Sequence, residues 1–191
     1  NSVLREFSFP EHPSDPYRFF VGDGMEVLAR RAAPPGTPDQ TIKLMTQRMG
    51  ETYRDNWDKL THPYPGIKEL LDELTHRGLP LGVLSNKPDP FTQLMIRHYF
   101  GESRFGAIAG AKPEVAKKPD PAGALALAQD LAVAPADFLY LGDTNTDMKT
   151  ALAAGMLAVG VTWGFRPRRE LEDAGAEFII DHPQELLAKL C

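Results

Sequence analysis

Three short segments of the sequence carry residue types that bind phosphate groups and divalent cations. Ser85 follows one apolar run, Lys118 lies in a loop after a second run, and Asp143 and Asp147 follow a third. The Ser85 hydroxyl and the backbone N–H groups after it can hold phosphoryl oxygens, and a lysine acts on them as a point charge. Two neighbouring carboxylates repel each other unless a proton or a cation intervenes, and oxygen ligands favour Mg²⁺. These segments therefore predict a joint site for phosphate and magnesium.

Each of these residues also has a purely structural alternative. Asp143 stands between an apolar run and a helical pattern, so it could cap that helix. Ser85 lies among residues that favour turns, and Lys118 belongs to a pair of lysines that could simply be exposed. The second carboxylate, Asp147, lies four residues after Asp143 in the first turn of the helix, so both can face one point. The combination of the three segments favours the site.

The elements that must position these residues alternate between strand and helix. Short apolar runs predict buried strands over 79–84, 105–109, 138–141, 157–161 and 178–180. Apolar spacing and composition predict helices over 67–74, 91–99, 122–131, 148–152 and 183–190. This alternation predicts an α/β fold with a doubly wound parallel sheet. Because ligands bind beyond the carboxyl ends of such strands, the three segments are expected to meet at one edge.

The first sixty residues have a different pattern. Apolar residues recur at intervals of three and four over 24–33 and again over about 38–59, which predicts two amphipathic helices. No segment in this part alternates like a strand. We therefore expect a helical domain over 1–61 and an α/β domain over 62–191.

Composition excludes several classes of protein. The chain has 191 residues, 21 basic and 26 acidic side chains and a net charge of −5, which argues against a nucleic-acid partner. No apolar run approaches the ~18 residues of a membrane span, and no signal peptide opens the chain. A single cysteine indicates a reducing compartment, so we expect a cytoplasmic protein. The histidines lack zinc-ligand spacing, and no Gly-x-Gly-x-x-Gly supports a dinucleotide cofactor.

Taken in order, the three segments resemble motifs of the haloacid dehalogenase-like (HAD-like) hydrolase superfamily, most closely its phosphoglycolate phosphatase branch. Ser85 in Val-Leu-Ser-Asn-Lys resembles the second motif, and Lys118 in Lys-Pro-Asp-Pro resembles the third. Asp143 and Asp147 resemble the acidic fourth motif. The resemblance implies that Ser85, the Asn86 amide and Lys118 bind the phosphoryl group, with Ser85 and Lys118 serving catalysis, and that Asp143 and Asp147 hold Mg²⁺.

The resemblance also implies a role for the helical part as a C1-type cap on a HAD-like Rossmannoid core. The segment Phe-Val-Gly-Asp-Gly that contains Asp23 is similar to the cap of phosphoglycolate phosphatases. Asp23, Arg30 and Arg31 would then be able to reach the leaving group. For the two arginines, ion pairing at the surface is the alternative.

The activity implied by the resemblance is Mg²⁺-dependent hydrolysis of a phosphomonoester through an aspartyl-phosphate. The expected partner is a small phosphorylated metabolite, with 2-phosphoglycolate first, and the protein is expected to be a monomer or a homodimer. Alternatives are a pyrophosphatase, a sugar-phosphate phosphatase or mutase of the same superfamily, and a non-catalytic phosphate-binding pseudoenzyme. A receiver-like domain would combine similar residues, but the helical first part and the Lys-Pro-Asp-Pro loop fit it poorly.

One departure from the family pattern concerns its first motif, Asp-x-Asp-Gly-Thr, which supplies the nucleophile and the general acid/base. The sequence contains no Asp-x-Asp. The chain opens within what resembles the first cap helix, so we expect the motif and its central strand to be removed rather than mutated, and this form to be truncated and inactive. A parallel sheet without its middle strand would leave two strands unpaired beside an apolar trench that something else must fill.

Overall fold

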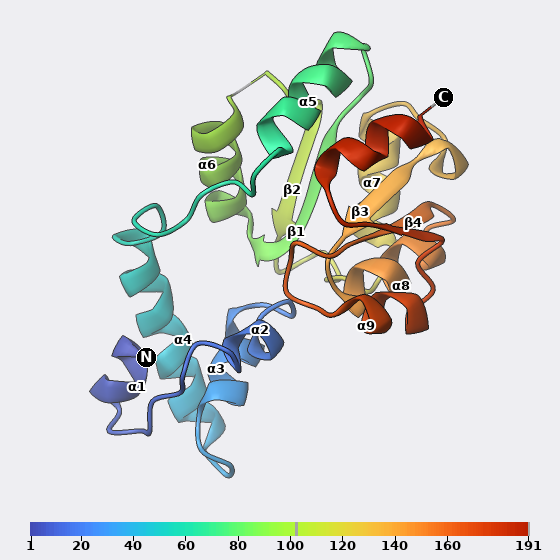
Figure 1. Cartoon of the computed structure of the whole chain (residues 1–191). Coiled ribbons are helices and arrows are strands. Elements are labelled where there is room, and N and C mark those ends of the chain that lie inside the picture. The colour runs from blue at the N-terminus through green and yellow to red at the C-terminus, as the bar shows by residue number, and fades with distance from the viewer. Residues whose placement is uncertain (102, 191) are drawn as a thin grey trace. The chain divides into compact units, whose positions relative to one another are not determined.

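The structure is a computed structural model that describes residues 1–101 and 103–190. It divides into two compact units, Asn1–His62 and Pro63–Cys191 (Figure 1). One buried apolar cluster lies in the first unit and two lie in the second. Within the described part of the chain, no helix is both long enough and apolar enough to cross a membrane.

The first unit is helical, as the periodicity predicts. It contains α1 (Ser2–Glu6), α2 (Tyr17–Phe20), α3 (Met25–Ala32) and α4 (Asp39–Arg54). The apolar faces of three of these helices meet in one cluster, to which α4 contributes the buried Ile42 and Met45. These two residues are three positions apart, so they share one face of the helix.

The end of α4 differs from the prediction, which carried the helix to Lys59. The helix ends at Arg54. Two residues later, the Asn56 side chain donates a hydrogen bond to the carbonyl oxygen of Thr52 at 2.7 Å. The backbone N–H of Asn56 bonds to Tyr53 O at 3.1 Å. Asparagine side chains compete in this way with regular helical bonding, and the helix is therefore shorter than its apolar spacing suggests.

The second unit alternates strands and helices, which confirms the predicted α/β class. Its strands are β1 (Gly82–Pro88), β2 (Ala107–Ala111), β3 (Leu139–Gly142), β4 (Leu157–Val161) and β5 (Phe178–Ile180). Its α-helices are α5 (Ile67–His76), α6 (Asp89–Phe100), α7 (Ala122–Asp130), α8 (Asn145–Ala153) and α9 (Arg168–Asp173). Two segments are 3₁₀-helical, η1 (Pro135–Asp137) and η2 (Pro183–Lys189).

Every strand pair in the described residues is parallel, but the pairs form two sheets. One sheet has the order β1-β2 and the other β3-β4-β5 (Figure 1). Leu84 pairs with Ala109 in the first sheet, and Leu141 pairs with Val159 in the second. β1 and β3 therefore each lie at an edge of their sheet.

The first strand is displaced from its predicted position at 79–84. β1 begins at Gly82, after Pro80, which has no N–H for a ladder. The strand continues to Pro88, but its register with β2 is irregular between Leu84 and Pro88. Ser85 thus lies at the end of the regular ladder. β2 is likewise two residues later than predicted.

The last predicted helix, at 183–190, is a 3₁₀-helix instead of an α-helix. Bonding between residues three apart is common in short pieces of helix such as this one.

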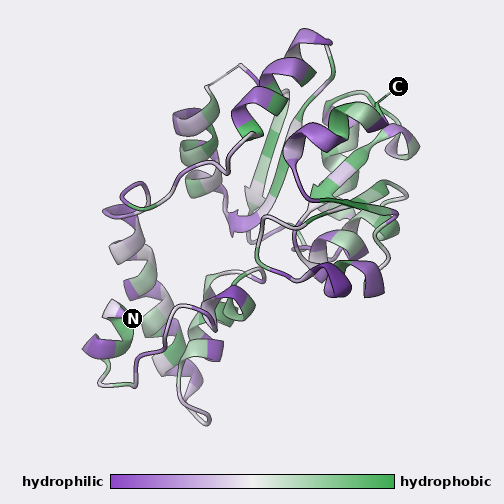
Figure 2. Ribbon diagram, viewed as in Figure 1, coloured by the Kyte–Doolittle hydropathy of each residue, from purple (hydrophilic) through white to green (hydrophobic). Residues whose placement is uncertain are grey.

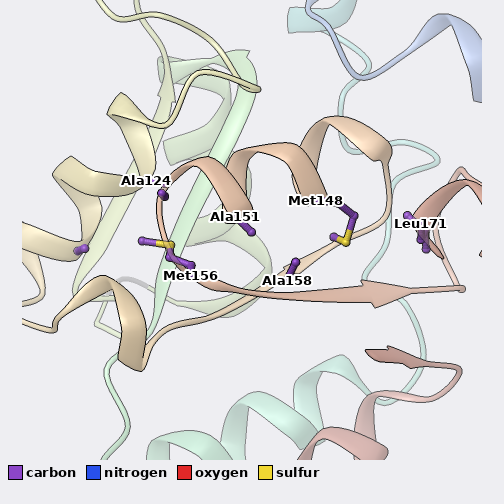
Figure 3. Packing of buried hydrophobic residues seen from close by; sticks show 8 residues of the cluster. Ala124, Met148, Ala151, Met156, Ala158 and Leu171 are labelled. Carbon is purple, nitrogen blue, oxygen red and sulfur yellow. The ribbon is translucent and has the colours of Figure 1, made fainter. Parts of the chain in front are cut away.

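β4 is buried on both faces, as a strand inside a parallel α/β sheet should be. On one face, Ala158 packs in a cluster with Met148 and Ala151 of α8 and with Ala124 of α7 (Figure 3). On the other face, Val159 lies in a cluster with residues of α5 and η2. Figure 2 shows the strands β3 and β4 largely hydrophobic, whereas α5 alternates between hydrophobic and hydrophilic residues. The helices thus cover both sides of this sheet.

An apolar cavity of about 360 Å³ lies between the two sheets. Residues of both edge strands line it, including Leu84 of β1 and Leu139 of β3.

Candidate functional site

The predicted site residues of the second unit come from the carboxyl ends of strands. Ser85 lies in β1, Lys118 in the loop between β2 and α7, and Asp143 and Asp147 at the start of α8 after β3. The Lys118 ammonium donates hydrogen bonds to Asp147 Oδ1 at 2.7 Å and to the carbonyl oxygen of Leu84 at 3.2 Å. Lys118 therefore joins the end of one sheet to the end of the other. The meeting of Lys118 and Asp147 is as predicted.

The backbone around Lys118 is fixed by the side chain of Asn86. The Asn86 amide donates to Lys118 O at 3.1 Å, and its oxygen accepts from Lys118 N at 2.9 Å. Asn86 is buried, with 7% of its surface exposed. The sequence predicted a role only for the backbone amide of Asn86. Its side chain is thus a positioning group that sequence reasoning missed.

Ser85 lies next to Leu84, whose carbonyl oxygen receives the Lys118 ammonium. The Ser85 hydroxyl oxygen accepts a hydrogen bond from the N–H of Lys87 at 3.1 Å. A hydroxyl that accepts one bond keeps its own O–H as a donor. The Ser85 hydroxyl therefore keeps a donor at the end of the regular β1 ladder.

The N-terminus of α8 is capped by Thr144, not by Asp143. Thr144 N and Oγ1 both donate to Asp147 Oδ2, at 3.1 and 2.7 Å, and Asp147 N donates back to Thr144 Oγ1 at 3.3 Å. The alternative interpretation of Asp143 as the helix cap is therefore wrong. The Thr-x-x-Asp spacing is a capping-box signature that the sequence analysis passed over. Both carboxylate oxygens of Asp147 are thus engaged, one by the cap and one by Lys118.

Asp143 is held by the loop that follows β4. Its Oδ2 accepts a hydrogen bond from Phe165 N at 2.8 Å, and its carbonyl oxygen accepts one from Arg166 N at 3.3 Å. A Cβ added at Gly164 would lie 2.2 Å from Asp143 Cβ, so only glycine lets the loop approach this closely. One feature of the sequence could have indicated this loop. It follows the carboxyl end of β4, which lies in the same sheet as β3, and ligand sites of parallel sheets lie at that edge.

Burial and the neighbouring charges determine the protonation of the cluster. Burial raises the pKa of Asp143, with a further rise from the charge of Asp147, and the Phe165 N–H bond acts against both. Burial alone would lower the pKa of Lys118, but the nearby Asp147 and Tyr140 raise it overall. Burial raises the pKa of Tyr140 to about 12, although Lys118 acts against the shift. At neutral pH, Lys118 is therefore a cation and Tyr140 a neutral phenol.

The residues present fit a magnesium ion through Asp143. Mg²⁺ is usually held by one or two carboxylates and keeps several waters. A buried carboxylate with a raised pKa lacks a sufficient counter-charge, which a divalent cation would supply. Asp147 Oδ2 accepts two bonds from Thr144, whereas Oδ1 accepts one from Lys118 and keeps a second lone pair, so a role of Asp147 at such an ion stays a prediction. Among residues 1–101 and 103–190, no three His, Cys, Asp or Glu side chains gather into a metal site.

The predicted cap residues lie in the first unit and pair within it. Arg31 forms an ion pair with Asp23 at 2.6 Å, and Arg30 forms one with Asp39 at 2.8 Å. Arg30 also lies 3.5 Å from a carboxylate oxygen of Glu26. The ion-pairing alternative for both arginines is thus present in the structure, and contact of these residues with a leaving group stays a prediction.

Comparison with protein families and named proteins shows the family of this chain. The family model described as haloacid dehalogenase-like hydrolase matches residues 1–161. A probable phosphoglycolate phosphatase of Pseudomonas putida is 31% identical over 190 residues, which cover 97% of this chain and 75% of that protein. A phosphoglycolate phosphatase of Pasteurella multocida is 29% identical over 197 residues, which cover 100% of this chain and 88% of that protein.

Comparison with solved structures supports the fold. A predicted phosphoglycolate phosphatase from Haemophilus somnus 129pt matches with a TM-score of 0.89 at 24% identity, covering 100% of this chain and 88% of that one. A structure of a protein of similar description from Lactobacillus delbrueckii subsp. bulgaricus matches with a TM-score of 0.91 at 23% identity, covering 99% and 88%. At these identities the matches establish the HAD-like fold alone.

Proposed function

Because this chain belongs to the haloacid dehalogenase-like hydrolase family, we propose that its second unit is the phosphate- and magnesium-binding part of a phosphomonoester hydrolase. The observation that carries the proposal is the position of Lys118. Its ammonium lies beside Leu84 O, next to Ser85, and is paired with Asp147. A cation and a hydroxyl are thereby placed at the carboxyl ends of neighbouring parallel strands, where ligands of such sheets bind.

Each residue has a distinct task in the proposed site. The Ser85 hydroxyl and the Asn86 N–H donate to phosphoryl oxygens, and Lys118 stabilises their negative charge. Asp147 holds Lys118 in place, and Asp143 is the direct carboxylate ligand for Mg²⁺. When bound, Mg²⁺ offsets the charge on the phosphoryl oxygens. The substrate we propose is a small acid phosphate such as 2-phosphoglycolate, in agreement with the names of the relatives.

The proposed reaction proceeds through an aspartyl-phosphate, so it needs a nucleophilic carboxylate. Asp147 is assigned to the ion pair with Lys118 in the proposed site. Asp143 is the proposed metal ligand, and the sequence contains no Asp-x-Asp. We therefore propose that residues 1–191 alone bind phosphate esters without hydrolysing them. Mg²⁺-dependent release of phosphate from 2-phosphoglycolate by a pure, sequence-verified sample would refute this part.

Phosphate binding tests the site without requiring turnover. Isothermal titration with inorganic phosphate and with 2-phosphoglycolate, in the presence of Mg²⁺, should show saturable binding. A charged hydrogen bond contributes about 1.5–3 kcal/mol, so Lys118→Met should weaken binding by roughly 10- to 100-fold. Lys117→Met is the matched control, since Lys117 is the exposed neighbour in the same loop. Equal affinity of the two variants would remove Lys118 from the site.

A further inference from the structure

The loop of residues 162–168, between β4 and α9, holds Asp143 at two of its atoms. The N–H of Phe165 donates to Asp143 Oδ2 at 2.8 Å, and the N–H of Arg166 donates to the carbonyl oxygen of Asp143 at 3.3 Å. The first bond holds the carboxylate, and the second holds the backbone of the same residue. Because each carboxylate oxygen has two lone pairs, the Phe165 bond leaves acceptor sites for a cation. The loop therefore orients the Asp143 side chain without using up its oxygens.

The close approach of this loop to Asp143 depends on Gly164. A Cβ added at Gly164 would lie 2.2 Å from Asp143 Cβ and 2.3 Å from its Oδ2, closer than side-chain atoms can come. An alanine there would have to displace either the loop or the Asp143 side chain. Gly164 does not have a positive φ, so it is the contact with Asp143 that requires glycine.

The two ends of the loop are joined by Asp181, the residue that follows β5. Thr162 Oγ1 donates to Asp181 Oδ1 at 2.6 Å, and the guanidinium of Arg168 donates to Asp181 Oδ2, also at 2.6 Å. The N–H of Thr162 bonds in addition to the carbonyl oxygen of Ile180 at 3.2 Å, beyond the last paired residues of β4 and β5. One carboxylate thus closes the loop at its base.

The middle of the loop relies on these polar contacts more than on apolar packing. Trp163, near its start, packs against the apolar cluster on one face of the β3-β4-β5 sheet. The Phe165 side chain, by contrast, is exposed. The position of the Phe165 N–H, and with it the orientation of the Asp143 carboxylate, is therefore set by the bonds at the base and tip of the loop.

We propose that the loop 162–168, closed by Asp181, is a positioning element for Asp143 as the magnesium ligand. The inference rests on the proposed function, because it concerns the proposed cation site. Partners that hydrogen-bond a ligating carboxylate orient it, and losing them typically weakens metal binding by about 10- to 100-fold. Mg²⁺ requires near-octahedral geometry, whereas Ca²⁺ accepts a flexible one. A displaced Asp143 should therefore weaken the binding of Mg²⁺ more than that of Ca²⁺.

The first test substitutes the glycine. Isothermal titration of the 191-residue chain with MgCl₂, and separately with CaCl₂, should show Mg²⁺ binding about 10- to 100-fold weaker in Gly164→Ala. The ratio of Mg²⁺ to Ca²⁺ affinity should fall by at least about threefold, which a partly unfolded sample would not show. Gly50→Ala is the matched control, because its added Cβ meets only Met25, at 3.9 Å. Unchanged Mg²⁺ binding in Gly164→Ala, or equal weakening for both ions, would overturn the proposal.

The second test opens the base of the loop and needs no metal. Asp181→Ala removes the bonds to Thr162 and Arg168, so in chelator the Phe165 amide should exchange its hydrogen at least about threefold faster. Glu172→Ala is the matched control, since Glu172 lies 4.0 Å from the same guanidinium, and it should leave this exchange unchanged. If Gly164→Ala does not fold, this measurement decides. Equal exchange of the Phe165 amide in Asp181→Ala and the unsubstituted chain would overturn the proposal.

Asp143→Asn separates this inference from the proposed function. If Asp143→Asn loses Mg²⁺ binding while Gly164→Ala and Asp181→Ala keep it, the loop has no positioning role and the proposed function stands. If Asp143→Asn binds Mg²⁺ as tightly as the unsubstituted chain, Asp143 is not the ligand, and this inference fails together with that part of the proposed function.

Discussion

The ammonium of Lys118 and the carboxylate of Asp147 lie 2.7 Å apart and are largely buried, with 13% and 8% of their side chains exposed. Because Lys118 also bonds to Leu84 O, this pair connects the β1-β2 sheet with the β3-β4-β5 sheet. The pair therefore has a structural role in addition to the proposed role in phosphate binding.

Removing one partner of this pair should destabilise the fold strongly. Breaking a buried ion pair leaves an uncompensated charge and costs about 3–5 kcal/mol, so Lys118→Met and Asp147→Leu should each lower the free energy of unfolding by roughly that amount. The double variant should lose clearly less than the sum of the two. Urea unfolding followed by circular dichroism measures all three. Additive losses in the double variant would show that the two side chains do not depend on each other.

The side chain of Asn86 should be needed to hold the backbone at Lys118. Asn86→Ala removes both hydrogen bonds and leaves buried backbone groups unpaired, which should cost about 2–3 kcal/mol. Asn86→Asp keeps the acceptor for Lys118 N but loses the donor to Lys118 O. Hydrogen exchange of the Lys118 amide should therefore accelerate in Asn86→Ala and stay slow in Asn86→Asp. Equal exchange in both variants would contradict the positioning role.

The parts of the site that follow from the order of strands and helices could be predicted from the sequence, whereas contacts between residues far apart in the sequence could not. The approach of Lys118 and Asp147 follows from topology, because carboxyl ends of parallel strands share one edge. The pairing of the Asn86 side chain with the Lys118 backbone depends on the irregular register of β1, which no local pattern reveals. The bond from Phe165 N to Asp143 joins residues 22 positions apart and was equally hidden.

The strands were also predicted best where the local sequence pattern alone defines them. The predicted bounds of β4 and β5 agree with the structure, because each is a compact apolar run. β1 was misplaced because the apolar run continues through Leu79 and Pro80, which precede the ladder. Hydrophobic periodicity predicts one parallel sheet, and the separation into two sheets was not predicted because periodicity does not specify which strands pair.

Tyr140 should make the protein less stable in alkaline solution. Its pKa is raised to about 12 in the folded state, against an ordinary value of 10. Between pH 10 and 12 the unfolded chain loses this proton first, so stability present below pH 10 is lost as the pH rises, by up to roughly 3 kcal/mol. Urea unfolding between pH 9 and 12 should show this loss of unfolding free energy. The loss should be smaller in Tyr140→Phe, whereas Tyr64→Phe, which changes an exposed ring, should show the same loss as the unsubstituted protein. If the unfolding free energy of Tyr140→Phe falls with pH as steeply as that of the unsubstituted protein, Tyr140 is not the source of the loss.

Asp143 should destabilise the protein at neutral pH when no metal is bound. Burial raises its pKa, so the folded state keeps this proton to a higher pH than the unfolded chain does. The associated stability is present at acidic pH and is lost as the pH rises through the raised pKa. Asp143→Asn removes this loss and can still accept the Phe165 N–H bond. At pH 7 in the presence of a chelator, this variant should therefore unfold at a higher urea concentration than the unsubstituted protein.

Magnesium should reverse that order. Binding to the folded state alone stabilises a protein by mass action, so millimolar Mg²⁺ should raise the urea midpoint of the unsubstituted chain and leave that of Asp143→Asn unchanged. Asp137→Asn, at an exposed carboxylate, is the matched control and should respond to Mg²⁺ as the unsubstituted chain does. If Asp143→Asn is the less stable protein in chelator, or gains as much from Mg²⁺, then Asp143 is not the metal ligand that its buried carboxylate indicates.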